Sequence, residues 1–207
     1  MKIGILDIQG SVEEHFEALR KLRGVEVSLV KNLGGLEKLD GLVIPGGEST
    51  TLSKLIEKFG LGKGIQGVIK RGGVVYGTCA GAILIGKKVF GEGGVAKVDE
   101  KVKPLGLIDI DVSRNAYGRQ LDSFEAEVEV FLKGGAAKVP GVFIRAPIIS
   151  RIGNGVEVLA DYEGEPVLVR QEVPGGGVVV AGTFHPELTE DLRVYEEIFL
   201  GYSVTRI

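Results

Sequence analysis

The stretch VVYGTCAGAIL, residues 74–84, joins two patterns of secondary structure around Cys79, the single cysteine of the chain. Residues 73–76 are mostly β-branched or aromatic, which is typical of a buried strand, and residues 80–88 carry apolar side chains that suit a helix. Gly77 and Gly81 bracket the junction, where a side chain would block a sharp turn. The stretch therefore predicts a strand–turn–helix elbow with Cys79 at its tip.

A lone cysteine often packs simply as a small buried hydrophobic residue, and this is the alternative interpretation of Cys79. On an elbow, however, the side chain projects from the edge of the sheet above the N-terminus of the helix. The free N–H groups and the dipole at that end favour the thiolate, which is the nucleophilic form. Serine takes the same place in the G-x-S-x-G elbow of hydrolases. We therefore predict that Cys79 is a nucleophile.

Strand and helix patterns alternate through the first half of the chain. Ser11 precedes one predicted helix and Glu14 follows three residues later, which predicts a capping box. Strands that alternate with helices pair in parallel through right-handed crossovers. The predicted strands are residues 2–6, 25–30 and 41–44, and the predicted helices are residues 12–23 and 50–59.

Extended patterns dominate the second half of the chain, and several alternate polar with apolar residues. Such alternation is typical of antiparallel strands with one face in solvent. A final helix is predicted over residues 189–200. We therefore predict one α/β domain, residues 1–207, folded as a three-layer sandwich with a mixed, mainly parallel central sheet. The extended segments are residues 107–112, 123–132, 142–150, 156–162, 166–171 and 178–184.

Composition excludes several classes of protein. The chain has 207 residues and a net charge of −3 without a basic stripe, which argues against a nucleic-acid partner. One cysteine excludes an internal disulfide framework and fits a reducing compartment. The N-terminal sequence MKIGILDIQG predicts neither a signal peptide nor a membrane span, so we expect a soluble cytoplasmic protein. Two distant histidines and one cysteine are too few for a metal site.

Reactive side chains follow the carboxyl ends of four predicted strands, where open α/β sheets bind their ligands. Gln9, residues 46–49, Cys79 and the His185–Glu187 segment all take such places. In an extended or turning His-Pro-Glu, the first and third side chains can point to the same side. Glu187 could then orient His185 while its other nitrogen accepts the thiol proton. A structural histidine beside a surface carboxylate remains the alternative.

The segment PGGEST, residues 45–50, predicts a loop with exposed backbone donors. Adjacent glycines after a strand leave N–H groups unshielded, which suits an oxyanion hole. The alternative is a glycine turn in which Ser49 caps the following helix, although this leaves Glu48 unexplained. His15, on the first predicted helix, is assigned outside the site, as a boundary or partner-facing residue.

Three motifs taken together resemble the triad, or class I, glutamine amidotransferases: GTCAG at residues 77–81, FHPE at 184–187 and PGGE at 45–48. Further segments are similar to the family of glutaminase subunits of pyridoxal 5′-phosphate synthase, and the likeness runs from residue 1 to about residue 200. Asp7 departs from the pattern, where a small residue is more usual, and so does Tyr117, where Phe is common. The further segments are LDIQG (6–10), PGGESTT (45–51), SRNAYGRQ (113–120) and FIRA (143–146).

This resemblance implies an enzyme that hydrolyses L-glutamine to glutamate and ammonia through a glutamyl thioester, with no cofactor or metal. Cys79 would be the nucleophile, His185 the proton carrier and Glu187 its orienting group. The backbone N–H groups of Gly47 and Ala80 would form the oxyanion hole. The residues implied in holding glutamine are Gly47, Glu48, Ser49, Arg114, Ile144 and Arg145.

The resemblance also implies a partner. A separate barrel-shaped synthase subunit would use the ammonia, with a pentose phosphate and a triose phosphate, to build pyridoxal 5′-phosphate within a hetero-oligomer. Gln9 is the residue expected to couple docking of this partner to the glycine loop. Other interpretations stay open: an amidotransferase subunit of another pathway, a cysteine hydrolase acting on peptides or small amides, or a non-catalytic regulatory scaffold.

Overall fold

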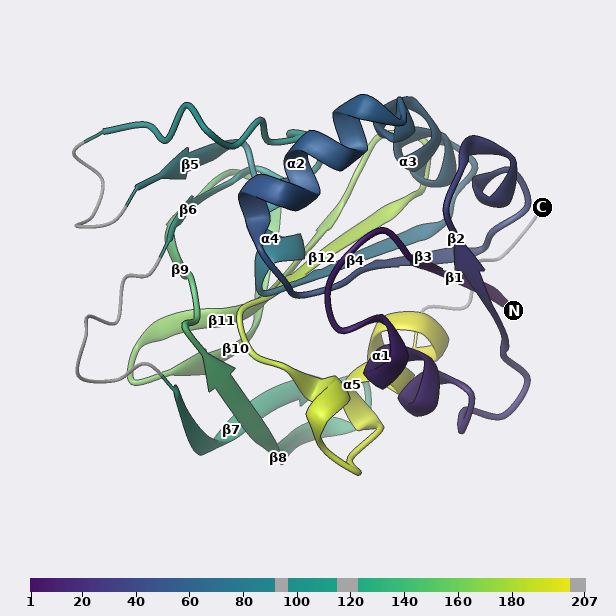
Figure 1. The fold of residues 1–207 in the computed structure, drawn as a ribbon. Coiled ribbons are helices and arrows are strands. Elements are labelled where there is room, and N and C mark those ends of the chain that lie inside the picture. Colours follow the sequence, from purple (N-terminus) through teal and green to yellow (C-terminus); the bar gives the residue numbers. More distant parts are fainter. Residues whose placement is uncertain (92–96, 115–122, 202–207) are drawn as a thin grey trace.

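The computed structural model describes residues 1–91, 97–114 and 123–201, and a nine-stranded mixed sheet forms its centre (Figure 1). The strand order is β2-β1-β3-β4-β12-β11-β10-β7-β8. Neighbours from β2 to β12 pair in parallel and those from β12 to β8 pair antiparallel. The predicted mixed sheet is confirmed, with antiparallel pairings as numerous as parallel ones in the described chain. The strands are β1 (Lys2–Leu6), β2 (Glu26–Val30), β3 (Gly41–Ile44), β4 (Val74–Thr78), β7 (Ser123–Leu132), β8 (Gly135–Ile144), β10 (Val156–Tyr162), β11 (Glu165–Glu172) and β12 (Val178–Gly182).

Helices cover both faces of the parallel part of this sheet, which confirms the predicted three-layer sandwich (Figure 1). Successive residues of β3 alternate between the two cores: Leu42 and Ile44 face one layer of helices and Val43 faces the other. None of the helices in the described ranges is long and apolar enough to cross a membrane. One layer contains η1 (Leu33–Leu36), α2 (Ser49–Lys58), α3 (Leu61–Lys70) and α4 (Ala80–Ile85), and the other contains α1 (Val12–Leu19), η2 (Pro186–Leu188), α5 (Arg193–Tyr195) and the π-helical turn η3 (Glu196–Leu200).

The strands β1, β3, β4 and β12 are adjacent and parallel. Their carboxyl ends therefore share one rim: Ile44 pairs with Gly77, and Gly182 pairs with Thr78. This confirms the predicted convergence of four strand ends. The rim brings the segments after these strands, which hold Gln9, the glycine loop, Cys79 and His185, to one place.

A second sheet of three strands, which the sequence patterns did not predict, lies beside the antiparallel half (Figure 1). It consists of β5 (Lys88–Phe90), β6 (Ile110–Ser113) and β9 (Ile148–Ile152). Because β6 and β9 are antiparallel and Ser113 pairs with Ile148, Arg114 and Arg145 lie at the same end of this small sheet. The small sheet therefore carries two of the residues predicted to hold glutamine.

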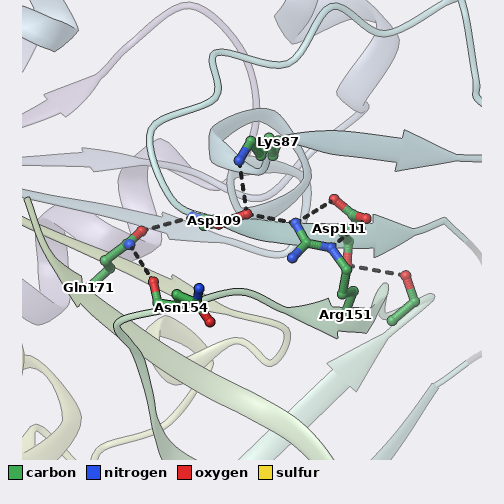
Figure 2. A network of polar contacts seen from close by, with 7 residues as sticks. Lys87, Asp109, Asp111, Arg151, Asn154 and Gln171 are labelled. Carbon is green, nitrogen blue, oxygen red and sulfur yellow. Dashed lines mark hydrogen bonds and ion pairs between the residues drawn. The ribbon is translucent and has the colours of Figure 1, made fainter.

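A polar network anchors the other end of the small sheet to the large one (Figure 2). The guanidinium of Arg151 on β9 donates to Asp111 at 2.8 Å and to Asp109 at 2.6 Å, and Lys87 donates to Asp109 at 3.2 Å. The backbone N–H of Asp109 donates to the Gln171 side chain of β11 at 2.8 Å, and Gln171 donates to the carbonyl of Asn154 at 3.1 Å. The bond from Asp109 to Gln171 links the small sheet to the large one.

Several predicted boundaries were wrong, and glycine explains two of them. The first helix ends at Leu19 and not at residue 23, because tighter bonds (Lys21 to Ala18, Leu22 to Leu19) and a left-handed Gly24 follow it. Helix α3 was not predicted, since three glycines in its ten residues lower helix propensity. The structure uses one of them: a Cβ at Gly64 would lie 2.5 Å from Leu36.

The predicted strand over residues 142–150 is two strands. Arg145 takes a left-handed backbone (φ 44°), which ends β8 before β9 begins. The first part of β8, GAAKVPG, has few β-forming residues and was not predicted, but its backbone pairs with β7 along its whole length. The predicted helix over 189–200 begins only at Arg193, and α5 continues directly into the π-helical turn η3. The segment 107–112 is a strand only from Ile110.

Candidate active site

Cys79 lies on a strained elbow between β4 and α4. Its backbone has φ 50° and ψ −104°, a region that residues with a side chain rarely adopt. A Cβ at Gly81 would lie 2.0 Å from the carbonyl oxygen of Ile44, and a Cβ at Gly77 would lie 2.6 Å from the backbone of Gly81. The sequence argument that small residues are required on both sides of Cys79 is therefore confirmed. The elbow turns the cysteine out over the rim.

The thiol of Cys79 lies between β8 and the histidine of the rim. Its Sγ approaches the carbonyl oxygen of Ile144 at 3.9 Å, a weak donor contact. A Cβ at Gly46 would lie 2.6 Å from the imidazole of His185 and 3.4 Å from the Cβ of Cys79, so both side chains flank Gly46. Among the described residues, Nε2 of His185 has no hydrogen-bond partner. That nitrogen is free to accept a proton from the thiol.

The other nitrogen of His185 contacts Glu187. Nδ1 lies 2.7 Å from Oε1 of Glu187, and both side chains are buried, which confirms the predicted contact between them. The backbone N–H of His185 donates to the carbonyl of Val142 at 2.8 Å, which ties the histidine to β8. Glu187 lies on the short turn η2, where Pro186 occupies the first position. The surface carboxylate considered as an alternative is excluded, since Glu187 is only 6% exposed.

The electrostatics of this pair favour an ion pair with a protonated histidine. Burial alone would lower the pKa of His185, but the neighbouring Cys79, the hydrogen bond with Glu187 and the charges of both groups raise it to about 10. Burial alone would raise the pKa of Glu187, but the electrostatic interaction with His15, the hydrogen bond from His185 and the charge of His185 lower it below the ordinary value. An ionised Glu187 therefore supports a proton on His185.

Two residues of the first helix segment contact Glu187, and the sequence prediction was wrong for both. The Ser11 hydroxyl donates to Oε1 of Glu187 at 2.8 Å and makes no capping bond, so the predicted capping box with Glu14 does not form. His15 is fully buried and not partner-facing, and its Nε2 lies 3.4 Å from Oε1 of Glu187. Ser11 and His15 are four residues apart, which places them on one face of a helix. That spacing, combined with a rim glutamate, is the signal that could have found them.

The glycine loop after β3 is clamped by the loop after β1. The Ser11 N–H donates to the carbonyl of Gly46 at 3.1 Å, and the Gln9 side chain accepts from the N–H of Glu48 at 3.0 Å. Gly10 has φ 108°, and a Cβ there would lie 1.8 Å from the Gly46 oxygen. A Cβ at Gly47 would lie 2.5 Å from the Gln9 amide oxygen. The two loops therefore fit together only with glycine at these positions.

Glu48, and not Ser49, caps the helix that follows the glycine loop. The carboxylate of Glu48 accepts from the N–H groups of Thr50 at 3.0 Å and Thr51 at 2.6 Å. Burial alone would raise the pKa of Glu48, but the hydrogen bonds from Thr50 and Thr51 together lower it to about 2. Ser49 is the first residue of α2 and is buried, so its predicted capping role was wrong. Glu48 remains half exposed at the rim.

Three of the residues predicted to hold glutamine, Gly47, Glu48 and Ser49, belong to the glycine loop, and the other three lie at the ends of β6 and β8. Arg114 donates to Asp99 at 2.6 Å and lies 3.5 Å from Glu48. Ile144 contacts the thiol through its carbonyl, and Arg145 next to it is exposed, with no ion pair to another described residue. Most of the SRNAYGRQ motif, residues 115–120, lies outside the described residues.

Metal binding has no structural support within the ranges 1–91, 97–114 and 123–201, where no three His, Cys, Asp or Glu side chains form a group that could hold an ion. The chemistry available to the site is nucleophilic. A thiol on an elbow, an imidazole and a buried carboxylate are the parts of a nucleophile–base–orienter triad, and backbone donors of a glycine loop lie beside them.

Comparison with known proteins points the same way. Residues 5–204 match the model of the SNO glutamine amidotransferase family. The chain is 48% identical to pyridoxal 5′-phosphate synthase subunit PdxT of Thermosipho africanus, over 95% of this chain and 96% of that protein. It is 45% identical to the protein of the same name from Thermotoga neapolitana, over 94% and 96%.

Solved structures agree with these sequence matches. A crystal structure of a glutamine amidotransferase superposes with a TM-score of 0.81 at 43% identity, covering 94% of this chain and 95% of that one. The PurLQS structure from Thermotoga maritima shares the fold, with a TM-score of 0.65 at 15% identity, covering 95% and 96%. With the elbow, the buried His185–Glu187 pair and the clamped glycine loop on one rim, this chain belongs to the SNO glutamine amidotransferase family.

Proposed function

We propose that the chain hydrolyses L-glutamine to glutamate and ammonia, with Cys79 as nucleophile, His185 as proton carrier and Glu187 as the group that orients His185. The observation that carries this proposal is the buried contact of His185 with Glu187 beside a cysteine on a strained elbow. Residues 1–207 are taken as one glutaminase domain. The raised pKa of His185 supports transfer of the thiol proton to its Nε2, which leaves a thiolate to attack.

The reaction follows the course of acyl transfer. The thiolate attacks the side-chain amide carbon of glutamine, and the negative charge moves to the amide oxygen. Backbone N–H groups of Gly47 and Ala80 are the proposed donors to that oxygen. His185 then protonates the leaving nitrogen, ammonia departs, and a glutamyl thioester remains on Cys79. Water activated by His185 hydrolyses the thioester to glutamate and regenerates the thiol.

The α-amino and α-carboxylate groups of glutamine require opposite charges. Arg114 and Arg145, both at the near end of the small sheet, are the proposed partners of the carboxylate, because a guanidinium can bind it through two parallel hydrogen bonds. Glu48, half exposed at the rim, supplies negative charge for the ammonium group. Gly47, Ser49 and Ile144 complete the proposed contacts.

The ammonia is proposed to pass to a separate synthase subunit of pyridoxal 5′-phosphate synthase, a barrel-shaped partner in a cytoplasmic hetero-oligomer. Relatives at 45–48% identity carry the name of a subunit of that synthase. The contact of Gln9 with Glu48 and of Ser11 with Gly46 supports a coupling role for the loop after β1, since a flip of the Gly46–Gly47 peptide would break the bond from Ser11. A docking partner that moves this loop would change the donors of the oxyanion hole.

The direct test is glutamine hydrolysis by the wild type and by Cys79→Ala, measured as glutamate release in the presence of the synthase subunit. We expect the variant to lose activity on the order of 10⁶-fold, because the members of a triad act as a unit. Its circular dichroism spectrum and thermal unfolding serve as controls for folding. Near-normal turnover by Cys79→Ala would remove the nucleophile assignment.

A panel of substrates separates the proposed function from its alternatives. A cysteine hydrolase would cleave peptides or simple amides faster than glutamine, and a non-catalytic scaffold would cleave none of them. A subunit of another pathway would hydrolyse glutamine without a response to the pyridoxal 5′-phosphate synthase partner.

Assays with and without the synthase subunit test whether docking of this partner is coupled to glutamine hydrolysis. We expect the isolated chain to be a poor glutaminase and the synthase subunit to raise kcat by roughly 10²–10³, the effect of one oxyanion-hole donor. Gln9→Ala should reduce this activation at saturating glutamine. Equal rates with and without the synthase subunit would refute activation by the partner. Full activation of Gln9→Ala would show that Gln9 has no role in this activation.

A further inference from the structure

The mechanism leaves a fully buried histidine unused. His15, on α1, has no exposed surface, and its edge packs against the ring of Tyr195 on α5, with centroids 6.0 Å apart at 81°. A buried imidazole with two polar nitrogens is costly unless both find partners. His15 therefore has a structural or a functional reason to occupy the space between α1 and the triad.

Its two nitrogens meet different partners. Nδ1 lies 2.6 Å from the hydroxyl of Tyr195, and Nε2 lies 3.4 Å from Oε1 of Glu187. Nε2 makes no hydrogen bond of good geometry to any described residue, so the Glu187 carboxylate is the polar group it faces. A lone pair on Nε2 would point at negative charge, whereas a proton there would be attracted to it. The geometry therefore favours the tautomer with the proton on Nε2, in which Nδ1 accepts from the Tyr195 hydroxyl.

The charges around His15 favour this neutral tautomer. Burial lowers the pKa of His15, and the charge of His185 lowers it further, against the opposite effects of Glu187 and of Glu14 on its own helix. Burial also raises the pKa of Tyr195 well above its ordinary value, so its hydroxyl keeps the proton that it donates. A neutral His15 can stabilise the carboxylate of Glu187 without competing with His185 for the positive charge.

The carboxylate oxygen that orients His185 is therefore held from the side of α1. Oε1 of Glu187 accepts from Ser11 at 2.8 Å, contacts Nδ1 of His185 at 2.7 Å, and faces Nε2 of His15. We propose that His15 is a positioning residue for the triad: its Nε2–H, 3.4 Å from Oε1, attracts the Glu187 carboxylate electrostatically and favours the orientation that serves His185, and Tyr195 fixes the tautomer. The effect on glutamine hydrolysis rests on the proposed function, but the effect on Cys79 does not.

A matched pair of variants tests the proposal. The side-chain nitrogen of His15→Gln is as many bonds from Cα as Nε2 of histidine, whereas that of His15→Asn matches Nδ1. His15→Gln therefore keeps a donor facing Glu187, and His15→Asn keeps a polar group of the same kind without that donor. We expect His15→Asn to lose about tenfold in kcat, the lower end of the effect of losing a polar contact to a charged group. His15→Gln should retain most of kcat, and KM for glutamine should change little in both.

A second readout does not depend on glutamine. Cys79 is the only cysteine, so the rate of its alkylation by iodoacetamide at pH 7 reports the thiol beside His185 alone. We expect slower alkylation in His15→Asn than in wild type, and recovery in His15→Gln. Tyr195→Phe removes the hydroxyl that fixes the tautomer of His15 and leaves Glu187 unchanged. Its alkylation rate should lie between those of the two His15 variants. Thermal unfolding of each variant measures any loss of stability.

The outcomes separate the two proposals. If wild type fails to hydrolyse glutamine but the alkylation rates follow the predicted order, the proposed function is wrong and the positioning role stands. Equal kcat and equal alkylation in His15→Asn and His15→Gln would overturn the positioning role and leave the glutaminase intact. Should His15→Asn fail to fold, Tyr195→Phe decides: wild-type kcat and alkylation in that variant would also overturn the proposal.

Discussion

The catalytic side and the substrate side of the site are built differently. Cys79, His185 and Glu187 follow parallel strands and are only 8%, 7% and 6% exposed. Across the rim, Ile144 is 39% exposed and Arg145 is exposed as well, at the end of an antiparallel strand. The triad is thus enclosed by the protein itself, whereas Ile144 and Arg145 of the proposed glutamine site are open to solvent.

This difference follows from the chemistry that each side has to perform. Proton transfer requires donor and acceptor within hydrogen-bond distance before substrate arrives, and burial strengthens the charges that align them. A grip on an amino acid has to admit and release its ligand, so its charges stay accessible. The far end of the small sheet is anchored instead by polar contacts: Arg151 donates to Asp109 and Asp111, and the backbone N–H of Asp109 donates to Gln171 of the large sheet (Figure 2).

The largest expected effect of a substitution is on the catalytic side of the site. We expect His185→Asn to lower kcat nearly as far as removal of the nucleophile, on the order of 10⁶, and Glu187→Gln to lower it by about 10⁴, because an orienting group contributes less than the base it orients. Steady-state glutaminase assays with the synthase subunit present measure both. KM should change little.

Glutamine binding measured by calorimetry in a Cys79→Ala background is the control for these two variants. An affinity that falls with kcat would mean that the triad also holds the substrate. The distinction between the two sides of the site would then be lost.

On the substrate side the expected effect is smaller and appears in a different constant. Arg114→Lys and Arg145→Lys should raise KM about tenfold with kcat nearly unchanged, because one of two hydrogen bonds to the carboxylate is lost. The pair also sharpens the comparison within this side, since Arg114 is committed to Asp99 and Arg145 has no ion pair to another described residue. Unchanged calorimetric affinity in both variants would remove them from the site.

The smallest expected effect is on the free energy of unfolding. The two histidines should change its pH dependence in opposite directions. The pKa of His185 is raised to about 10, so its contribution is present below the ordinary pKa of 6.5 and is lost as pH rises from there towards 10. The pKa of His15 is lowered by burial, so its contribution is present above 6.5 and is lost as pH falls below that value.

Urea unfolding at a series of pH values measures both slopes. We expect His185→Asn to flatten the alkaline loss of stability and His15→Gln to flatten the acid loss. An alkaline slope that is the same in wild type and His185→Asn would contradict the raised pKa of His185.

Local sequence patterns predicted the parallel half of the sheet and the positions of the triad residues well. The strand ends before Gln9, the glycine loop, Cys79 and His185 follow from hydrophobic period and turn residues, and parallel pairing then brings them to one rim. The contact of His185 with Glu187 follows from their spacing of two residues. Motifs of this kind are visible in sequence because strand, turn and reactive group are neighbours along the chain.

Tertiary structure alone decided the remainder. The segment GAAKVPG is a strand because β7 pairs with it, and α3 is a helix despite its glycines because Gly64 packs closely on Leu36. Ser11 leaves its predicted cap for Glu187, 176 residues further on, and His15 lies buried against the same carboxylate. The sequence by itself determined the elbow, the parallel rim and the His-Pro-Glu contact, since each depends on local periodicity and spacing. The polar neighbours of Glu187 could not be determined in this way, because a hydroxyl or imidazole on a helix finds its partner only after the layers have packed.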